Sequence, residues 1–197
     1  MAVPTIQPGQ IKTGPGRILY APLGTAIPTF TAAASKITGT WTTWLEVGAT
    51  DSGLTYTEST ETSDVNVAES LYPVRTVTTG KGSRVAFTMS HISDVNWKLA
   101  MNGGTITTSG TGVTKLNTYV PPLVGAENRV MLGFLSLEED EVLIWPQVFN
   151  VGSVETARGA FDTKAGLPVE FAAELPDPAV MLTPYKRWTS GQLAQGV

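Results

Sequence analysis

Apolar and polar residues alternate along most of this chain, which is the pattern of half-buried β-strands. The alternation is clearest at LPVEFAAEL (167–175). Its expected inward side is Leu167, Val169, Phe171, Ala173 and Leu175, with Glu170 and Glu174 outward. Similar segments occur at RILYAP (17–22), TWTTWLEVG (40–48), RVMLGFLSLE (129–138) and VLIWPQVFNVG (142–152). Many short strands separated by turn residues predict a mostly β fold, an antiparallel β-sandwich or barrel.

One segment has a helical pattern instead. SDVNWKLAM (93–101) places Ser93 or Asp94 at an N-cap position, and Gly103-Gly104 follows its end. Val95 and Leu99 fall on one side of such a helix. The sequence therefore predicts one short flanking helix at about residues 94–101.

GLTYTESTETSDVNVAES (53–70) predicts a hairpin that turns at Thr60-Glu61. This register pairs Leu54 with Val67 and Tyr56 with Val65, so the apolar residues share one face. The other face is uncharged to acidic and consists of Thr55, Thr57, Ser59, Asp64 and Asn66.

PVRTVTTGKGSRVAFTMS (73–90) predicts a second hairpin that turns at Gly80-Lys81-Gly82. It pairs Val77 with Val85 and Arg75 with Phe87, and its polar face carries Thr76, Thr78, Arg84, Ala86 and Thr88. Because the two hairpins adjoin in the sequence, we expect one sheet. The side chains expected to pack on the core are Leu54, Tyr56, Val65, Val67, Val77, Val85 and Phe87.

The first 40 residues are rich in Pro, Gly, Ala and Thr. We interpret residues 1–40 as an extended N-terminal arm with little core, residues 41–180 as the β domain, and residues 181–197 as a C-terminal arm.

Composition narrows the function. The chain has 197 residues, a net charge of −4 and no cysteine. An acidic chain is not expected to bind nucleic acid or anionic membranes in general, and disulfides and thiolate metal sites are excluded. No secretory signal or membrane span is visible, so we expect a soluble product made in the cytoplasm.

Candidate chemistry is sparse. The one histidine, His91, continues the alternation of Val85, Phe87 and Met89, as a packed or strand-end residue would. The Gly-rich stretch GKGSR lacks the phosphate-loop spacing, and the acidic run EEDE (138–141) fits a solvated strand-to-strand tip. We therefore expect no catalytic residue, no cofactor and no metal.

The residues from Trp41 to Gly104 resemble the core of major tail tube proteins of long-tailed, non-contractile bacteriophages. The resemblance lies in the order of WLEVGATDSGLTYT, the acidic segment VNVAESLYPV, the strand TGKGSRVAFTM and the helix NWKLAMN. The resemblance implies a β-sandwich with a flanking helix, similar to the contractile-tail inner tube and the type VI secretion tube.

Such proteins form hexameric rings that stack into a tube, and the resemblance implies a virion component that conducts DNA without binding it specifically. Its implied partners are further copies of itself, the tape-measure protein, and the tail tip and terminator proteins, with no membrane. The implied lumen-facing residues are Thr55, Thr57, Ser59, Asp64, Asn66, Thr76, Thr78, Arg84 and Thr88. The alternative is another β-sandwich binding module, of the capsid-decorating or adhesin type, and an enzyme would need acids or a base near His91.

Overall fold

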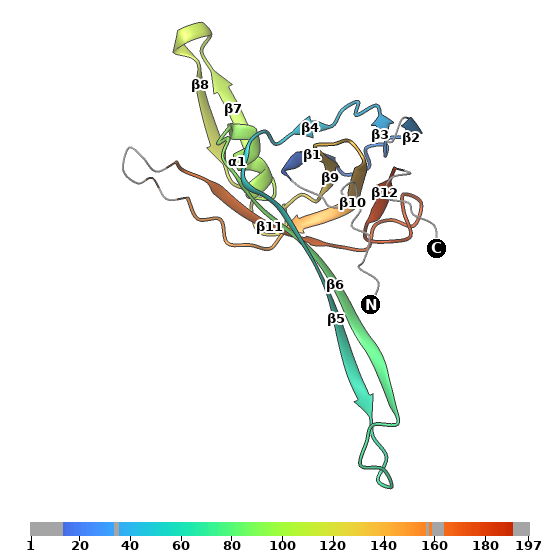
Figure 1. Ribbon diagram of the computed structural model, residues 1–197. Helices are drawn as coiled ribbons and strands as arrows, with labels where there is room; N and C mark the ends of the chain where they lie inside the picture. The colour runs from blue at the N-terminus through green and yellow to red at the C-terminus, as the bar shows by residue number, and fades with distance from the viewer. Residues whose placement is uncertain (1–13, 34–35, 157, 159–163, 191–197) are drawn as a thin grey trace.

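The computed structural model describes residues 14–33, 36–156, 158 and 164–190 (Figure 1). In these residues the chain is mostly β, with one α-helix and antiparallel strand pairs, as the sequence predicts. The elements in chain order are β1 (Gly16–Pro22), β2 (Phe30–Ala33), β3 (Lys36–Gly39), β4 (Leu45–Glu46), β5 (Thr50–Val65), β6 (Arg75–Met89), α1 (Asp94–Ala100), β7 (Thr105–Ser109), a 3-10 turn (Gly112–Thr114), β8 (Leu116–Val120), β9 (Val130–Ser136), β10 (Glu141–Asn150), β11 (Leu167–Ala173) and β12 (Lys186–Thr189).

The main sheet has the strand order β4-β1-β9-β10-β11-β6-β5, and β12 pairs with the first half of β10 on the edge opposite β9. The ribbons β2-β3 and β7-β8 are separate from it. The hairpin of β5 and β6 projects far beyond the body, and β7-β8 projects in a different direction (Figure 1).

Two hydrophobic cores lie on opposite sides of this sheet, because successive residues of a strand face opposite ways. Ile18 and Tyr20 of β1 belong to the larger core, whereas Leu19 and Ala21 belong to the smaller one. The larger core also contains Trp145, Phe171 and the helix residue Leu99. The smaller core is closed by Phe30 and Ile37 of the β2-β3 ribbon together with Trp41, Trp44 and Trp188. The sheet thus has an apolar cover on both sides of its β1-β9-β10 part.

The predicted helix is confirmed as α1, with Ser93 as its N-cap: the Ser93 hydroxyl accepts a hydrogen bond from the Asn96 backbone N–H at 3.1 Å. Asn96 is buried, and its side-chain amide donates to the carbonyls of Val47 (2.8 Å) and His91 (2.7 Å). Leu99 packs in the core as expected, but Val95 is exposed.

The prediction of two short hairpins is wrong, because β5 and β6 form one long hairpin. β5 continues through Thr60-Glu61 and β6 through Gly80-Lys81-Gly82, so Thr60 pairs with Lys81 and the real connection is residues 66–74. The glycines that suggested a turn are extended, and they leave room for their partners. A Cβ at Gly82 would lie 2.8 Å from Ser59 Oγ, and one at Gly80 3.0 Å from Glu61 Oε2.

The new register changes the expected packing. Val85 and Phe87 are buried, and Leu54 and Tyr56 pack against the larger core, as expected. Val65, Val67 and Val77 are 47%, 43% and 39% exposed, because they lie on the part of the hairpin beyond the body. The predicted pairs Leu54–Val67 and Tyr56–Val65 are replaced by Leu54–Phe87 and Tyr56–Val85.

Both predicted arms contain strands of the main sheet. β1 pairs with β9 along its whole length, so the expectation of little core in residues 1–40 is wrong for Gly16–Pro22. β12 pairs with β10, and Trp188 packs against the smaller core. Residues 1–13 and 191–197 of the arms lie outside the described residues. Leu175, expected inward, is exposed because β11 ends at Ala173.

Candidate functional surface

One face of β11, β6 and β5 belongs to neither core. On this face, Thr55 lies opposite Ala86, Thr57 opposite Arg84, and Thr88 opposite Pro168. We call this surface the polar face, and it consists of Thr55, Thr57, Ser59, Arg84, Ala86, Thr88, Pro168, Glu170 and Ala172. It is the side of the sheet opposite the larger core, which β11 and β6 meet through Phe171, Val85 and their neighbours.

The polar face continues the side of the sheet that the β2-β3 ribbon covers over β1, β9 and β10. Val142 and Ile144 of β10 point to that covered side and are buried, whereas Pro168, Glu170 and Ala172 of β11 are only partly buried. The sequence accounts for the difference. Where the cover is present the outer residues are large and apolar, and where it is absent they are Thr, Ala, Pro and charged residues.

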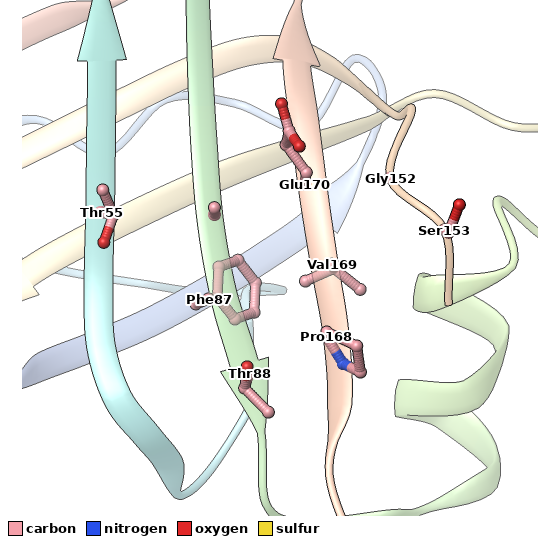
Figure 2. Close-up of a pocket in the computed structure, with 9 residues that line it drawn as sticks. Thr55, Phe87, Thr88, Gly152, Ser153, Pro168, Val169 and Glu170 are labelled. Atoms are coloured by element: carbon pink, nitrogen blue, oxygen red, sulfur yellow. The ribbon is translucent and has the colours of Figure 1, made fainter. Parts of the chain in front are cut away.

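An open groove of about 300 Å³ lies on this surface between the strands and the start of the β10-β11 connection. Its lining includes Thr55, Thr88, Gly152, Ser153, Pro168 and Glu170. Figure 2 shows Thr55, Thr88, Pro168 and Glu170 on neighbouring strands, with Gly152 and Ser153 on the connection beside β11. The groove has one carboxylate and no histidine, so it lacks the paired groups of general acid–base catalysis.

Ion pairs neutralise the arginines at this surface. Arg84 Nη1 donates to Glu170 Oε1 at 2.5 Å across the β6-β11 pair. Four residues from Glu170, Glu174 accepts hydrogen bonds from Arg129 at 3.1 and 3.4 Å and from the Gln147 amide at 2.7 Å. The Gln147 hydrogen bond, and then Arg129, hold the pKa of Glu174 below its ordinary value. Glu174 is therefore a carboxylate at neutral pH.

The structure places only part of the predicted lumen set together. Thr55, Thr57, Ser59, Arg84 and Thr88 share the polar face. Asp64 pairs with Thr76, and Thr78 with Thr62, on the opposite side of the hairpin ribbon, where the Thr76 hydroxyl donates to Asp64 Oδ1 at 2.6 Å. Asn66 lies in the loop after β5. The separation follows from the register, because even-numbered residues of β5 face the side of Tyr56.

Four residues of this surface, Ala86, Pro168, Glu170 and Ala172, were not in the predicted lumen set, although Ala86 was predicted on the polar face of the second hairpin. The alternation of LPVEFAAEL did place Glu170 outward. What the alternation could not supply was the neighbouring strand. β11 pairs with β6 across a separation of about 80 residues, and no local signal encodes that pairing.

An unpaired strand edge adjoins the polar face. β5 is the last strand of the sheet order, so one side of this 16-residue strand has no partner strand within the described chain. Beyond it, the hairpin tip exposes Leu71 and Tyr72 by 100% and 80%. A long free edge and an apolar tip are the features by which β-proteins bind one another.

Neither a metal site nor a membrane-spanning helix is found among the described residues. His91 is exposed after the end of β6. Glu138, Glu139 and Asp140 lie in the connection between β9 and β10, as predicted, but Asp140 is buried and Glu141 is the first residue of β10, so the run is not solvated throughout.

A model of the family described as phage tail tube protein matches residues 6–175, which is most of the chain. The match extends well beyond the segment that carries the resemblance in the sequence, and it includes β1 through β11. A comparison with curated proteins finds no match.

Proposed function

This chain belongs to the phage tail tube protein family, and from that premise we propose that it forms stacked hexameric rings whose polar face lines a bore for DNA. As a family member it is a structural component of the virion tail that assembles with itself into a tube, and it is not an enzyme. The number of subunits in a ring follows from the resemblance. The non-contractile tail type and synthesis in the host cytoplasm belong to the same proposal.

The observation that carries the proposal is the position of the polar face beside the free edge of β5. A bare β-sheet face next to a 16-residue unpaired edge is a liability in a monomer. Pairing of β5 with a neighbouring copy removes the edge, and a closed barrel of such sheets leaves no edge at all. The polar face then turns toward the barrel axis in every copy.

The side chains of the polar face suit a surface along which DNA slides. Threonine and alanine offer neither charge nor an aromatic plane, so they neutralise no phosphate charge and stack on no base. Arg84 is paired with Glu170, and the net charge of the whole chain is −4. In this arrangement the tape-measure protein occupies the bore before DNA does, and tail tip and terminator proteins cap the tube. The tube contacts no membrane.

Electron microscopy and cysteine labelling test this arrangement together. Negative-stain images of the purified protein should show rings or tubes. Because the chain has no cysteine, a Thr57→Cys variant carries a single thiol on the polar face. In tubes, a small maleimide should label it, and a maleimide on a bulky polymer should not. In free subunits both reagents should react.

Ala32→Cys is the matched control, since Ala32 is exposed on β2, over the covered side of the sheet. Both reagents should label it in free subunits and in tubes. Labelling of Thr57→Cys by the bulky reagent in intact tubes would show that the polar face does not line the bore. Exclusion of both reagents from Thr57→Cys in tubes would mean that the polar face is buried between subunits, which also contradicts the proposal.

A further inference from the structure

One of the nine residues of the polar face is positively charged, and a second arginine lies at the border of this face. Arg84 is a member of the polar face, and Arg129 lies at its β10 border, over the ring of Phe149 at 4.8 Å. Phe149 pairs with Ala172, which places this ring on the same side of the sheet. An arginine on a surface that DNA passes is a phosphate-binding group unless its charge is already matched.

We propose that Glu170 and Glu174, the β11 carboxylates, keep Arg84 and Arg129 from binding DNA phosphates by holding each in an ion pair. The inference rests in part on the proposed function, because it assigns to two acids the task of keeping the bore free of anion sites. The sequence alone did not indicate that Arg84 and Arg129 lie beside these two glutamates.

The geometry of the Arg84–Glu170 pair is suited to this role. Glu170 is directly opposite Ala86, and Arg84 is directly opposite Ala172, so the two charged residues are diagonal neighbours on adjacent strands. The two alanines leave space for both long side chains to lie flat across the sheet. The contact of 2.5 Å is that of a charge-assisted hydrogen bond.

Glu174 holds Arg129 by a comparable arrangement. Arg129 contacts Glu174 through Nε and Nη2, with the Phe149 ring beneath its guanidinium. The amide of Gln147 donates to the same carboxylate and lowers its pKa. Glu174 thus presents a charged acceptor to Arg129 and leaves fewer guanidinium donors for a phosphate.

The side chains of these ion pairs are partly exposed to solvent, which limits their contribution to folding stability. The Arg84 and Glu170 side chains are 57% and 40% exposed, and pairs at such positions contribute little to folding stability. Their effect on the binding of DNA phosphates is expected to be larger. Each phosphate contact changes the slope of log K against log salt by about 0.9 for duplex DNA, and contacts repeat around every ring.

The test compares variants that each lose one negative charge and therefore have the same net charge. Glu170→Gln and Glu174→Gln keep the side-chain shape and remove the negative charge beside an arginine. Glu69→Gln, in the exposed hairpin connection, makes the same change of net charge away from the polar face. Arg84→Gln combined with Glu170→Gln removes both partners. The readout is fluorescence anisotropy of a labelled DNA duplex titrated with each full-length protein at about 20 mM salt.

We expect Glu170→Gln and Glu174→Gln to bind the duplex at least tenfold more tightly than wild type, with binding lost by about 200 mM salt. Glu69→Gln should bind like wild type, and the Arg84→Gln/Glu170→Gln protein should lose the gain. Thermal unfolding should be unchanged in all four. Equal DNA binding by Glu170→Gln and Glu69→Gln would overturn the proposal, as would persistence of the gain without Arg84.

Two further measurements separate this inference from the proposed function. If Glu170→Gln gains DNA binding but the bulky reagent reaches Thr57→Cys in tubes, the carboxylates act as proposed and the assignment of the bore is wrong. If tubes protect Thr57→Cys from the bulky reagent but Glu170→Gln binds DNA no better than Glu69→Gln, the proposed role of the carboxylates is refuted. The assignment of the polar face to the bore is then unaffected. In phage carrying Glu170→Gln, DNA ejection should slow, and adding Arg84→Gln should restore its rate.

Discussion

The hydroxyl of Tyr185 donates a hydrogen bond to Glu58 Oε2 at 3.2 Å, joining residues 127 positions apart. Tyr56 donates to the same oxygen at 3.1 Å, and the two tyrosine rings lie 5.3 Å apart between centroids. Tyr56 also lies against the buried Trp145, at 5.8 Å between ring centroids. The segment before β12 is therefore fastened to the hairpin at the point where β5 leaves the body.

Removing the Tyr185 hydroxyl should weaken this attachment without altering the ring packing. We expect Tyr185→Phe to lower the free energy of unfolding by about 1 kcal/mol, since one hydrogen bond to a carboxylate is lost while Tyr56 still satisfies Glu58. Urea denaturation measures the change. Tyr72→Phe, at the exposed hairpin tip, is the matched control and should unfold like wild type. A Tyr185→Phe protein as stable as that control would mean that the contact does not hold the hairpin root.

Alkaline pH should destabilise the protein through Tyr56. Burial, and then hydrogen bonding to Tyr185, raise the pKa of Tyr56 above its ordinary value of 10.0. The folded state therefore favours the neutral phenol. This contribution is complete below the unfolded-state pKa near 10, and it is lost as the pH rises through that value toward the folded-state pKa.

The free energy of unfolding should thus stay level to about pH 9.5 and fall above it. In Tyr56→Phe the fall should be shallower, although burial also raises the pKa of Tyr20 and of Tyr119, which will contribute. Denaturant titrations between pH 8 and about pH 11 provide the comparison. Identical slopes for wild type and Tyr56→Phe would contradict the assignment.

Asn150 should be a sensitive position, because its buried side chain ties the end of the helix to two strands. Its amide donates to the carbonyl of Ala100 at 2.6 Å, and its side-chain oxygen accepts from the backbone N–H groups of Gly152 (3.2 Å) and Glu170 (3.0 Å). Asn150→Ala removes these hydrogen bonds, although the Gly152 N–H keeps the Glu170 carbonyl as an acceptor, and should cost about 3 kcal/mol. Asn66→Ala, at an exposed site in the connection after β5, should change stability by less than about 0.5 kcal/mol. Calorimetry of the two variants distinguishes them.

The apolar hairpin tip should matter for assembly and not for folding. Leu71 and Tyr72 contribute little buried surface to the subunit, so changing both to serine should leave the melting temperature within about 1 °C. If the tip contacts another copy, the same variant should form fewer or shorter tubes under conditions where wild type assembles. Leu123→Ser, at an exposed residue in the β8-β9 connection, controls for general loss of surface hydrophobicity. Tube formation equal to that of wild type would exclude the tip from assembly contacts.

Much of the local structure was readable from the sequence. Alternation marked β11 and the region of β9 and β10, and the Ser93 cap marked the start of the helix. The same alternation placed Thr55 and Thr57 opposite Leu54 and Tyr56. Strand alternation and helix capping depend only on residues close together in the sequence, because the repeat of a strand or helix fixes how their side chains are oriented. The acidic run between β9 and β10 was placed for a similar reason.

The turns inside the hairpin were misread because glycine is ambiguous. Gly80 and Gly82 are typical of a tight turn, but here they are extended and lie opposite Glu61 and Ser59, whose side chains need the space. Two short hairpins and one long hairpin satisfy nearly the same local pattern. The choice between them depends on the partner of β6 on its other side, which is β11.

The sequence by itself determined the strand character, the single helix, the absence of cysteine chemistry and the resemblance to tail tube proteins. The tertiary structure alone decided which outward residues share a surface. Arg84 and Glu170 are 86 positions apart, and β1 and β12 joined the main sheet through partners far along the chain. Strand pairing over such distances is selected by burial of the whole core, since the period of a strand fixes which way a side chain points but not what it meets.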